Sequence, residues 1–166
     1  AWELMELAGN RIDKFAVLDS GVHPVKPDEP AKRQVLLDKA QSDGLQAVAD
    51  SWIPPMVHPD RHQDKDLIGA INAMIMRNSV DDFLGQMQAL LNRKDQTENL
   101  GLISQEVLLI AGEADSHSSP DQHKFMAERI NRSHLEVVKD AGHMVTMEKP
   151  GEVSTILLRW FIQNEQ

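Results

Sequence analysis

The chain has 166 residues, 41% of them hydrophobic, which is enough to bury a core, so we expect a globular domain or a large part of one. Its formal net charge of -9 is spread along the sequence, and its 17 Lys and Arg residues form no basic stripe, so we expect no nucleic-acid partner. The absence of Cys excludes disulfides, thiolate catalysis and Cys-ligated zinc; it also fits a reducing compartment, and we predict a cytoplasmic location.

The first 22 residues predict the end of a helix followed by a strand. Residues 1–8 carry apolar side chains at helical spacing, and the sequence opens without an initiator Met or an apolar leader, so we expect it to enter in mid-helix. Residues 15–18 form a short apolar run, typical of a strand buried on both faces of a parallel sheet. No apolar stretch approaches the roughly 20 residues that span a bilayer, so no membrane partner is expected.

Residues 23–99 predict a helical insertion. Prolines between His23 and Pro30 interrupt regular structure and mark its start. The apolar spacing then predicts two short helices, around 35–40 and 45–52, and two further helices over 67–75 and 80–91. The polar run 92–99 closes the insertion.

Residues 100–166 alternate between strands and helices. The apolar runs 107–110 and 135–138 predict strands, and the apolar spacing predicts a helix after each of them. Ser119 and Pro120 supply a cap and a first-turn proline for the first of these helices. This order predicts an α/β fold with a parallel sheet.

An acidic residue and a histidine follow the two predicted strands. Asp115 and His143 both lie at the carboxyl ends of consecutive strands, where the loops of a parallel sheet emerge on one edge, so we expect them to meet. Each residue alone has an ordinary explanation in turn or loop chemistry. Together they form a carboxylate and imidazole pair, in which the acid orients the base of a nucleophilic enzyme.

The segments VLLIAGEAD (107–115) and DAGHMVTMEKP (140–150) resemble the acid and histidine motifs of the α/β-hydrolase superfamily. The resemblance is specific over 103–162 and follows the family's order over the rest of the chain. It implies the C-terminal part of an α/β-hydrolase fold, with strands six to eight of the parallel sheet and a helical cap insertion. Residues 1–22 would be the end of the nucleophile helix and the sixth strand, 23–99 the cap, and 100–166 the C-terminal core.

By this resemblance Asp115 is the triad acid and His143 the general base. Glu113, two positions earlier in the same turn, is the rival acid, and the register of the motif favours Asp115. The sequence contains no Gly-x-Ser-x-Gly nucleophile elbow, since residues 19–21 follow the wrong strand to form one. We therefore expect the nucleophile just upstream of residue 1.

The resemblance implies a cofactor-free serine hydrolase whose substrate is a small-molecule carboxylic ester, and a chain that is inactive alone. A C-C bond hydrolase, an amidase or a dehalogenase on the same fold is an open alternative. Another is a non-catalytic fragment or interaction module. Either form is expected to associate through an exposed sheet edge, with the N-terminal half of the hydrolase or with a second copy.

Two further residues are candidates for substrate binding. Trp52, beside the break at Pro54-Pro55, and Met144, directly after the histidine, are predicted to line the pocket. His58 and His62 have the spacing of metal ligands, but Pro59 favours a loop and no third ligand is evident, so no metal site is predicted. A solvated surface position is expected for the remaining unpatterned histidines, His117, His123 and His134.

Overall fold

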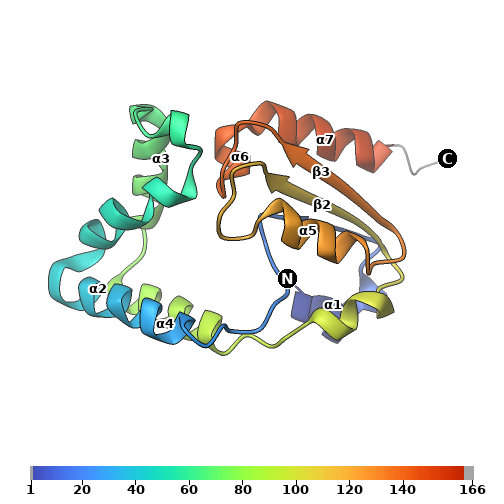
Figure 1. Ribbon diagram of the computed structural model, residues 1–166, viewed down its shortest axis with the longest axis horizontal. Helices are drawn as coiled ribbons and strands as arrows, with labels where there is room; N and C mark the ends of the chain where they lie inside the picture. The colour runs from blue at the N-terminus through green and yellow to red at the C-terminus, as the bar shows by residue number, and fades with distance from the viewer. Residues whose placement is uncertain (1, 163–166) are drawn as a thin grey trace.

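The computed structural model describes residues 2–162 and contains a three-stranded parallel sheet (Figure 1). The strands are β1 (Lys14–Leu18), β2 (Glu106–Gly112) and β3 (Ser133–Val138), and their spatial order is β1-β2-β3. Leu18 pairs with Ile110, and Gly112 pairs with Val138, so the carboxyl ends of the strands lie together. The predicted α/β fold with a parallel sheet is confirmed.

The two faces of the sheet carry separate cores, and β2 contributes to both. Val107 and Leu109 point into a core that includes α1 (Trp2–Ala8) and α5 (Pro120–Ala127). Leu108 and Ile110 point to the other face, where they pack with α7 (Pro150–Ile162). Because both faces are covered, every residue of β2 is buried, as its apolar run predicts.

β1 is less buried than its apolar sequence predicts. Only Val17 of this strand is fully buried, and the other four residues are partly exposed. Within residues 2–162, β1 pairs with β2 alone, so its second edge has no neighbouring strand. The prediction of burial on both faces is therefore wrong for β1, because a strand at the edge of a sheet is less completely covered.

The helical insertion stands apart from the sheet and holds α2 (Glu29–Trp52), α3 (Lys65–Ile75) and α4 (Val80–Leu91) (Figure 1). The two short helices predicted around 35–40 and 45–52 are the two parts of α2, which kinks at Gly44 with φ 79° and ψ 174°. Val48 and Met87 pack α2 against α4, and Ala49 and Ile71 pack α2 against α3. The boundaries 23–99 of the insertion remain a prediction.

Short helical turns complete the described chain: Gly9–Arg11, Pro54–Met56, Pro59–Arg61, Thr97–Leu102 and the four-residue α6 (Val145–Glu148). The predicted cap of α5 is present, since the Ser119 side chain accepts a hydrogen bond from the backbone N–H of Gln122. Among residues 2–162, no helix has the length and apolar character that a membrane span requires.

Candidate active site

Asp115 and His143 meet at the carboxyl edge of the sheet, as their positions after β2 and β3 predict. His143 Nδ1 donates a hydrogen bond of 2.9 Å to Asp115 Oδ2. The other carboxylate oxygen of Asp115, Oδ1, accepts hydrogen bonds from the backbone N–H groups of His117 (2.7 Å) and Ser118 (2.9 Å). These three bonds hold a buried carboxylate in one orientation, while the side chain of His143 keeps 23% of its surface exposed.

The interaction between Asp115 and His143 shifts both pKa values in the direction that favours the charged forms, carboxylate and imidazolium. Burial opposes ionisation of Asp115, but the hydrogen bonds from His143 and from the backbone outweigh it and lower the pKa of the carboxyl. Burial likewise opposes protonation of His143, yet the hydrogen bond to Asp115 and its negative charge raise the pKa of the imidazole. Among residues 2–162, His143 Nε2 has no hydrogen-bond partner, so this nitrogen is available to accept a proton.

Glu113, the rival acid, points elsewhere. Its side chain is exposed, and its Oε2 accepts a 3.4 Å hydrogen bond from the backbone N–H of Asp140. The geometry therefore pairs His143 with Asp115, in agreement with the register of the motif.

A buried glutamate that sequence reasoning did not single out anchors the histidine loop. Glu148 Oε1 accepts a 2.7 Å hydrogen bond from Gly142 N–H, and its Oε2 accepts a 2.7 Å bond from His58 N–H. Glu148 thus links the loop that carries His143 to the insertion. The sequence signal for Glu148 was its position inside the motif 140–150. The local sequence alone does not distinguish a buried Glu from an exposed Glu in a short helix.

Asp19 is a second residue whose role the sequence does not reveal. It follows β1 with φ 46°, a left-handed conformation that is uncommon for a residue other than Gly. Its Oδ1 accepts a hydrogen bond from Gly112 N–H and its Oδ2 one from Val145 N–H, both of 3.0 Å. Burial raises the pKa of its carboxyl to about 7, although the two hydrogen bonds oppose this shift. Asp19 therefore ties the ends of β1 and β2 to the start of α6, directly after the loop that carries His143.

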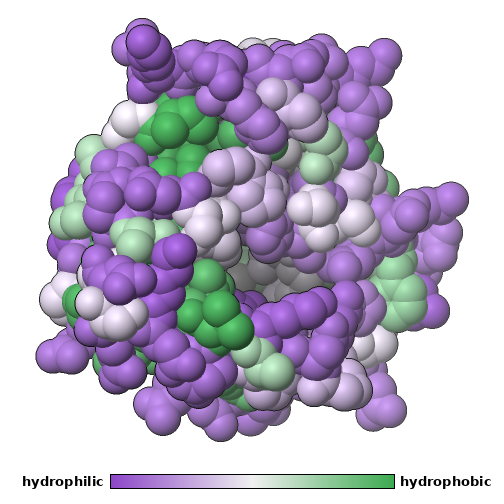
Figure 2. Space-filling model, turned by 60° about the vertical axis from the view of Figure 1, so that its left-hand side comes forward, coloured by the Kyte–Doolittle hydropathy of each residue, from purple (hydrophilic) through white to green (hydrophobic). Residues whose placement is uncertain are grey.

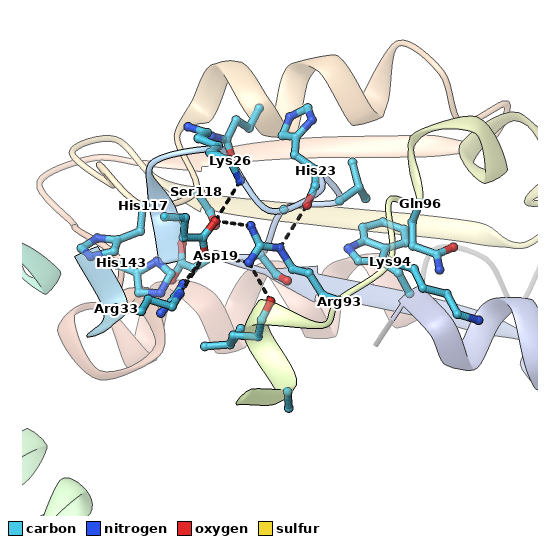
Figure 3. Close-up of a pocket in the computed structure, with 18 of the residues that line it drawn as sticks. Asp19, His23, Lys26, Arg33, Arg93, Lys94, Gln96, His117, Ser118 and His143 are labelled. Atoms are coloured by element: carbon cyan, nitrogen blue, oxygen red, sulfur yellow. Dashed lines mark hydrogen bonds and ion pairs between the residues drawn. The ribbon is translucent and has the colours of Figure 1, made fainter. Parts of the chain in front are cut away.

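A cavity of about 670 Å³ opens beside this pair, and His143 forms part of its wall (Figure 3). Trp52 lines the cavity, and so do Trp2 at the start of α1 and Met56, while a substrate contact by Trp52 stays a prediction. Met144 is not among the lining residues. It packs instead against the α2–α3 core, and its N–H donates a 3.1 Å hydrogen bond to Met56 O. A substrate contact by Met144 stays a prediction.

One face of the molecule is mixed in character. Figure 2 shows a face that is mostly hydrophilic, with hydrophobic groups gathered in separate patches. Ser20 and Ser118 line the cavity, but no hydroxyl within residues 2–162 is hydrogen-bonded to His143 Nε2.

One of the other histidines differs from its predicted surroundings. The prediction of a solvated surface position is wrong for His123, which is fully buried: its Nδ1 lies 3.1 Å from Ser119 O and its Nε2 accepts a 3.4 Å bond from Ser20 N–H. Helix α5 turns this side chain toward the loop after β1. Burial also lowers the pKa of the His123 imidazole. His134 is exposed, as expected.

Within the described residues, one group has the composition and spacing to hold a metal ion: Asp115, His117 and His143, whose ligand atoms lie within 4.8 Å of one another. Asp115 Oδ2 and His143 Nδ1 are already bonded to each other, so a metal would have to disrupt this pair. His58 and His62 belong to no such group, since His58 Nδ1 accepts from Asp60 N–H and His62 Nε2 is bonded to Pro54 O.

No protein-family model matches the chain, and no curated protein matches it significantly. Solved structures do. An esterase from Thermogutta terrifontis, with malate bound, matches with a TM-score of 0.91 at 23% identity, over 98% of this chain and 60% of that one. The enol-lactonase from Burkholderia xenovorans LB400 matches with a TM-score of 0.85 at 18% identity, over 96% of this chain and 60% of that one.

A hydrolase from Pseudomonas aeruginosa gives the same TM-score of 0.85 at 18% identity, over 97% of this chain and 60% of that one. The chain thus spans about 60% of the length of the structures that it matches. The agreement covers the sheet, the insertion and the loops that carry Asp115 and His143. The chain has the fold of the C-terminal part of an α/β-hydrolase.

Proposed function

We propose that this chain supplies the acid and the base of a cofactor-free serine hydrolase that cleaves small-molecule carboxylic esters. The observation that carries this proposal is the 2.9 Å hydrogen bond between Asp115 and His143, with Nε2 of the same imidazole unbonded and the histidine in a cavity wall. A buried carboxylate on one ring nitrogen leaves the other nitrogen as the basic site, which is the arrangement that activates a hydroxyl nucleophile.

The nucleophile belongs, in this proposal, to a segment that precedes residue 1 in the complete protein. Trp2, in the first turn of α1, lines the same cavity as His143. In this proposal, a residue shortly before α1 reaches the same cavity. In the α/β-hydrolase arrangement the serine stands on the turn between a strand and the helix that follows it, and its oxyanion hole includes a backbone N–H next to the serine.

The reaction then proceeds in two halves. His143 Nε2 accepts the serine proton while the serine oxygen attacks the ester carbonyl, and the imidazolium returns that proton to the departing alcohol. Water next attacks the acyl-enzyme with the same nitrogen as base, and the imidazolium then returns that proton to the serine oxygen as the carboxylic acid departs. Asp115 stays ionised throughout and stabilises the imidazolium.

The solved structures add support, because those named above include an esterase and an enol-lactonase, both of which act on bonds of the ester type. The first test is the gene sequence that precedes residue 1. A Gly-x-Ser-x-Gly motif there supports serine chemistry, whereas an aspartate at its centre would redirect the proposal to dehalogenation.

The second test is an assay with a 4-nitrophenyl ester, first on the isolated chain and then on the protein that includes the preceding half. We expect turnover only with the preceding half, and losses of several orders of magnitude in Asp115→Asn and His143→Ala. Glu113→Gln is the matched control, because Glu113 lies in the same turn but has no bond to His143. Full activity in both Asp115→Asn and His143→Ala would refute the assignment of the acid and the base.

The free edge of β1 favours a second candidate, a non-catalytic chain that associates with another protein. Within residues 2–162, β1 is paired on one side only, and an unpaired strand edge is a template for a further strand. Leu4 and Leu7 on α1 are also exposed, by 53% and 79%. Light scattering on the 166-residue chain tests this candidate: a monomer that does not bind the preceding half would exclude it.

A further inference from the structure

The wall of the cavity is richer in cations than the chain as a whole. The chain carries a formal net charge of -9, yet the Lys and Arg residues that line the cavity outnumber the acidic residues. The basic residues are Lys26, Lys32, Arg33, Arg93 and Lys94, and the acidic ones are Glu3, Asp19, Asp28 and Glu29. Several of these side chains are drawn around the cavity in Figure 3. A cavity with a local excess of positive charge suits an anionic ligand.

In this wall, two guanidinium groups share one carboxylate. Glu29 receives two hydrogen bonds from Arg93, of 2.7 Å and 2.6 Å, and Arg33 Nε donates a third, of 2.8 Å. The side chains of all three residues are largely buried, with exposures between 15% and 29%. The bonds from Arg93 and Arg33 lower the pKa of Glu29 to about 2 against the effect of burial. The cluster therefore keeps one uncompensated positive charge.

Arg93 has no N–H group left for a ligand. Besides Glu29, its five N–H groups reach the backbone carbonyls of His23 (3.1 Å), Pro24 (3.2 Å) and Leu90 (2.9 Å). These bonds join the loop after β1 to the end of α4. Arg93 is thus a structural residue of the cavity wall.

Arg33 is different, because only some of the N–H groups of its guanidinium have a hydrogen-bond partner. Its Nε and one N–H of Nη2 are engaged with Glu29, and one N–H of Nη1 contacts Met87 Sδ at 3.4 Å, a weak acceptor. Within residues 2–162, one N–H on each terminal nitrogen has no acceptor. In Figure 3 Arg33 is drawn at the same end of the cavity as His117 and His143. Its charge is also one of the causes that lower the pKa of His117, after burial and the charge of His143.

We propose that Arg33 binds a carboxylate of the substrate, so that the substrate class is half-esters or lactones that carry a second, free carboxylate. Two N–H groups on adjacent terminal nitrogens match the two oxygens of a carboxylate. One negative charge neutralises the surplus of the Arg33–Glu29–Arg93 cluster, whereas a phosphate dianion would exceed it. This inference rests on the proposed function, since it places the ester group of the same molecule at His143.

The catalytic experiment compares two esters in the protein that includes the preceding half. The esters are 4-nitrophenyl hemisuccinate, with a free carboxylate, and 4-nitrophenyl butyrate, a neutral ester of the same acyl length. We expect the wild type to favour the hemisuccinate, and Arg33→Gln to lower the ratio of the two kcat/KM values by about 10- to 100-fold, the size of a charged hydrogen-bond pair. Arg77→Gln is the matched control, because Arg77 is exposed and does not line the cavity.

A binding experiment separates this inference from the proposed function, because it needs no nucleophile. Succinate and inorganic phosphate are titrated into the 166-residue chain by calorimetry, with circular dichroism to verify that each variant is folded. We expect succinate to bind more tightly than phosphate, and Arg33→Gln to weaken succinate binding by about 10- to 100-fold. Arg33→Lys retains the charge facing Glu29 but lacks the planar guanidinium. We expect its affinity for succinate to lie between those of the wild type and Arg33→Gln.

The outcomes are distinguishable. If neither ester is hydrolysed but succinate binding depends on Arg33, the proposed function fails and the anion site stands. If both esters are hydrolysed and neither the kcat/KM ratio nor succinate binding responds to Arg33→Gln, the inference is overturned and the hydrolase remains. Tighter binding of phosphate than of succinate, or equal losses in Arg33→Gln and Arg77→Gln, would also overturn it.

Discussion

Replacement of Gly142 by Ala should separate the catalytic pair without touching either member. A Cβ at this position would lie 2.7 Å from the carbonyl carbon of Val57 and 2.8 Å from His58 N. Both are backbone atoms, so no rotamer change relieves the clash, and the loop must move by about 0.7 Å to reach an ordinary contact distance. A displacement of that size along the 2.9 Å bond between His143 and Asp115 would lengthen it to about 3.6 Å, too long for a hydrogen bond.

We expect Gly142→Ala to lower the free energy of unfolding by about 1–3 kcal/mol, as overpacking does, measured by urea denaturation of the chain. The pKa of His143, followed by NMR, should fall as the bond to Asp115 is lost. Gly69→Ala is the control: its Cβ meets nothing within 4 Å inside α3, so it should stabilise the protein by about 0.5–1 kcal/mol. A Gly142→Ala variant with unchanged stability and an unchanged His143 titration would refute this reasoning.

Three further predictions follow from the same geometry. Asp115→Asn removes the charge that raises the pKa of His143, so NMR titration should show a lower value; an unchanged pKa would mean that the pair is not formed in solution. Because only neutral imidazole accepts the serine proton, kcat/KM of the complete protein should rise with pH through the raised pKa of His143, and a plateau reached below 6.5 would contradict this. Gly44→Ala forces a side chain onto φ 79° and should cost about 1–3 kcal/mol in urea denaturation; equal stability would argue against the kink in α2.

Local sequence was sufficient to predict the helices and strands and the positions of the acid and the histidine. The apolar runs of β2 and β3 specify strands, and the helical spacing over 67–75 and 80–91 specifies α3 and α4, because these signals depend on neighbouring residues only. The motif also placed Asp115 and His143 at the same sheet edge. Local patterns did not reveal the burial of His123 or the partial exposure of β1, because neighbours in space determine both.

The sequence by itself determined a parallel α/β arrangement and a carboxylate and imidazole pair at the ends of two strands. Only the tertiary structure decided that Asp19 binds Val145, 126 positions further along the chain, that Glu148 ties the histidine loop to the insertion, and that Arg33 keeps unused N–H groups in the cavity wall. The physical reason is that hydrogen-bond partners and burial depend on which distant segments come together, and periodicity along the chain carries no information about those partners.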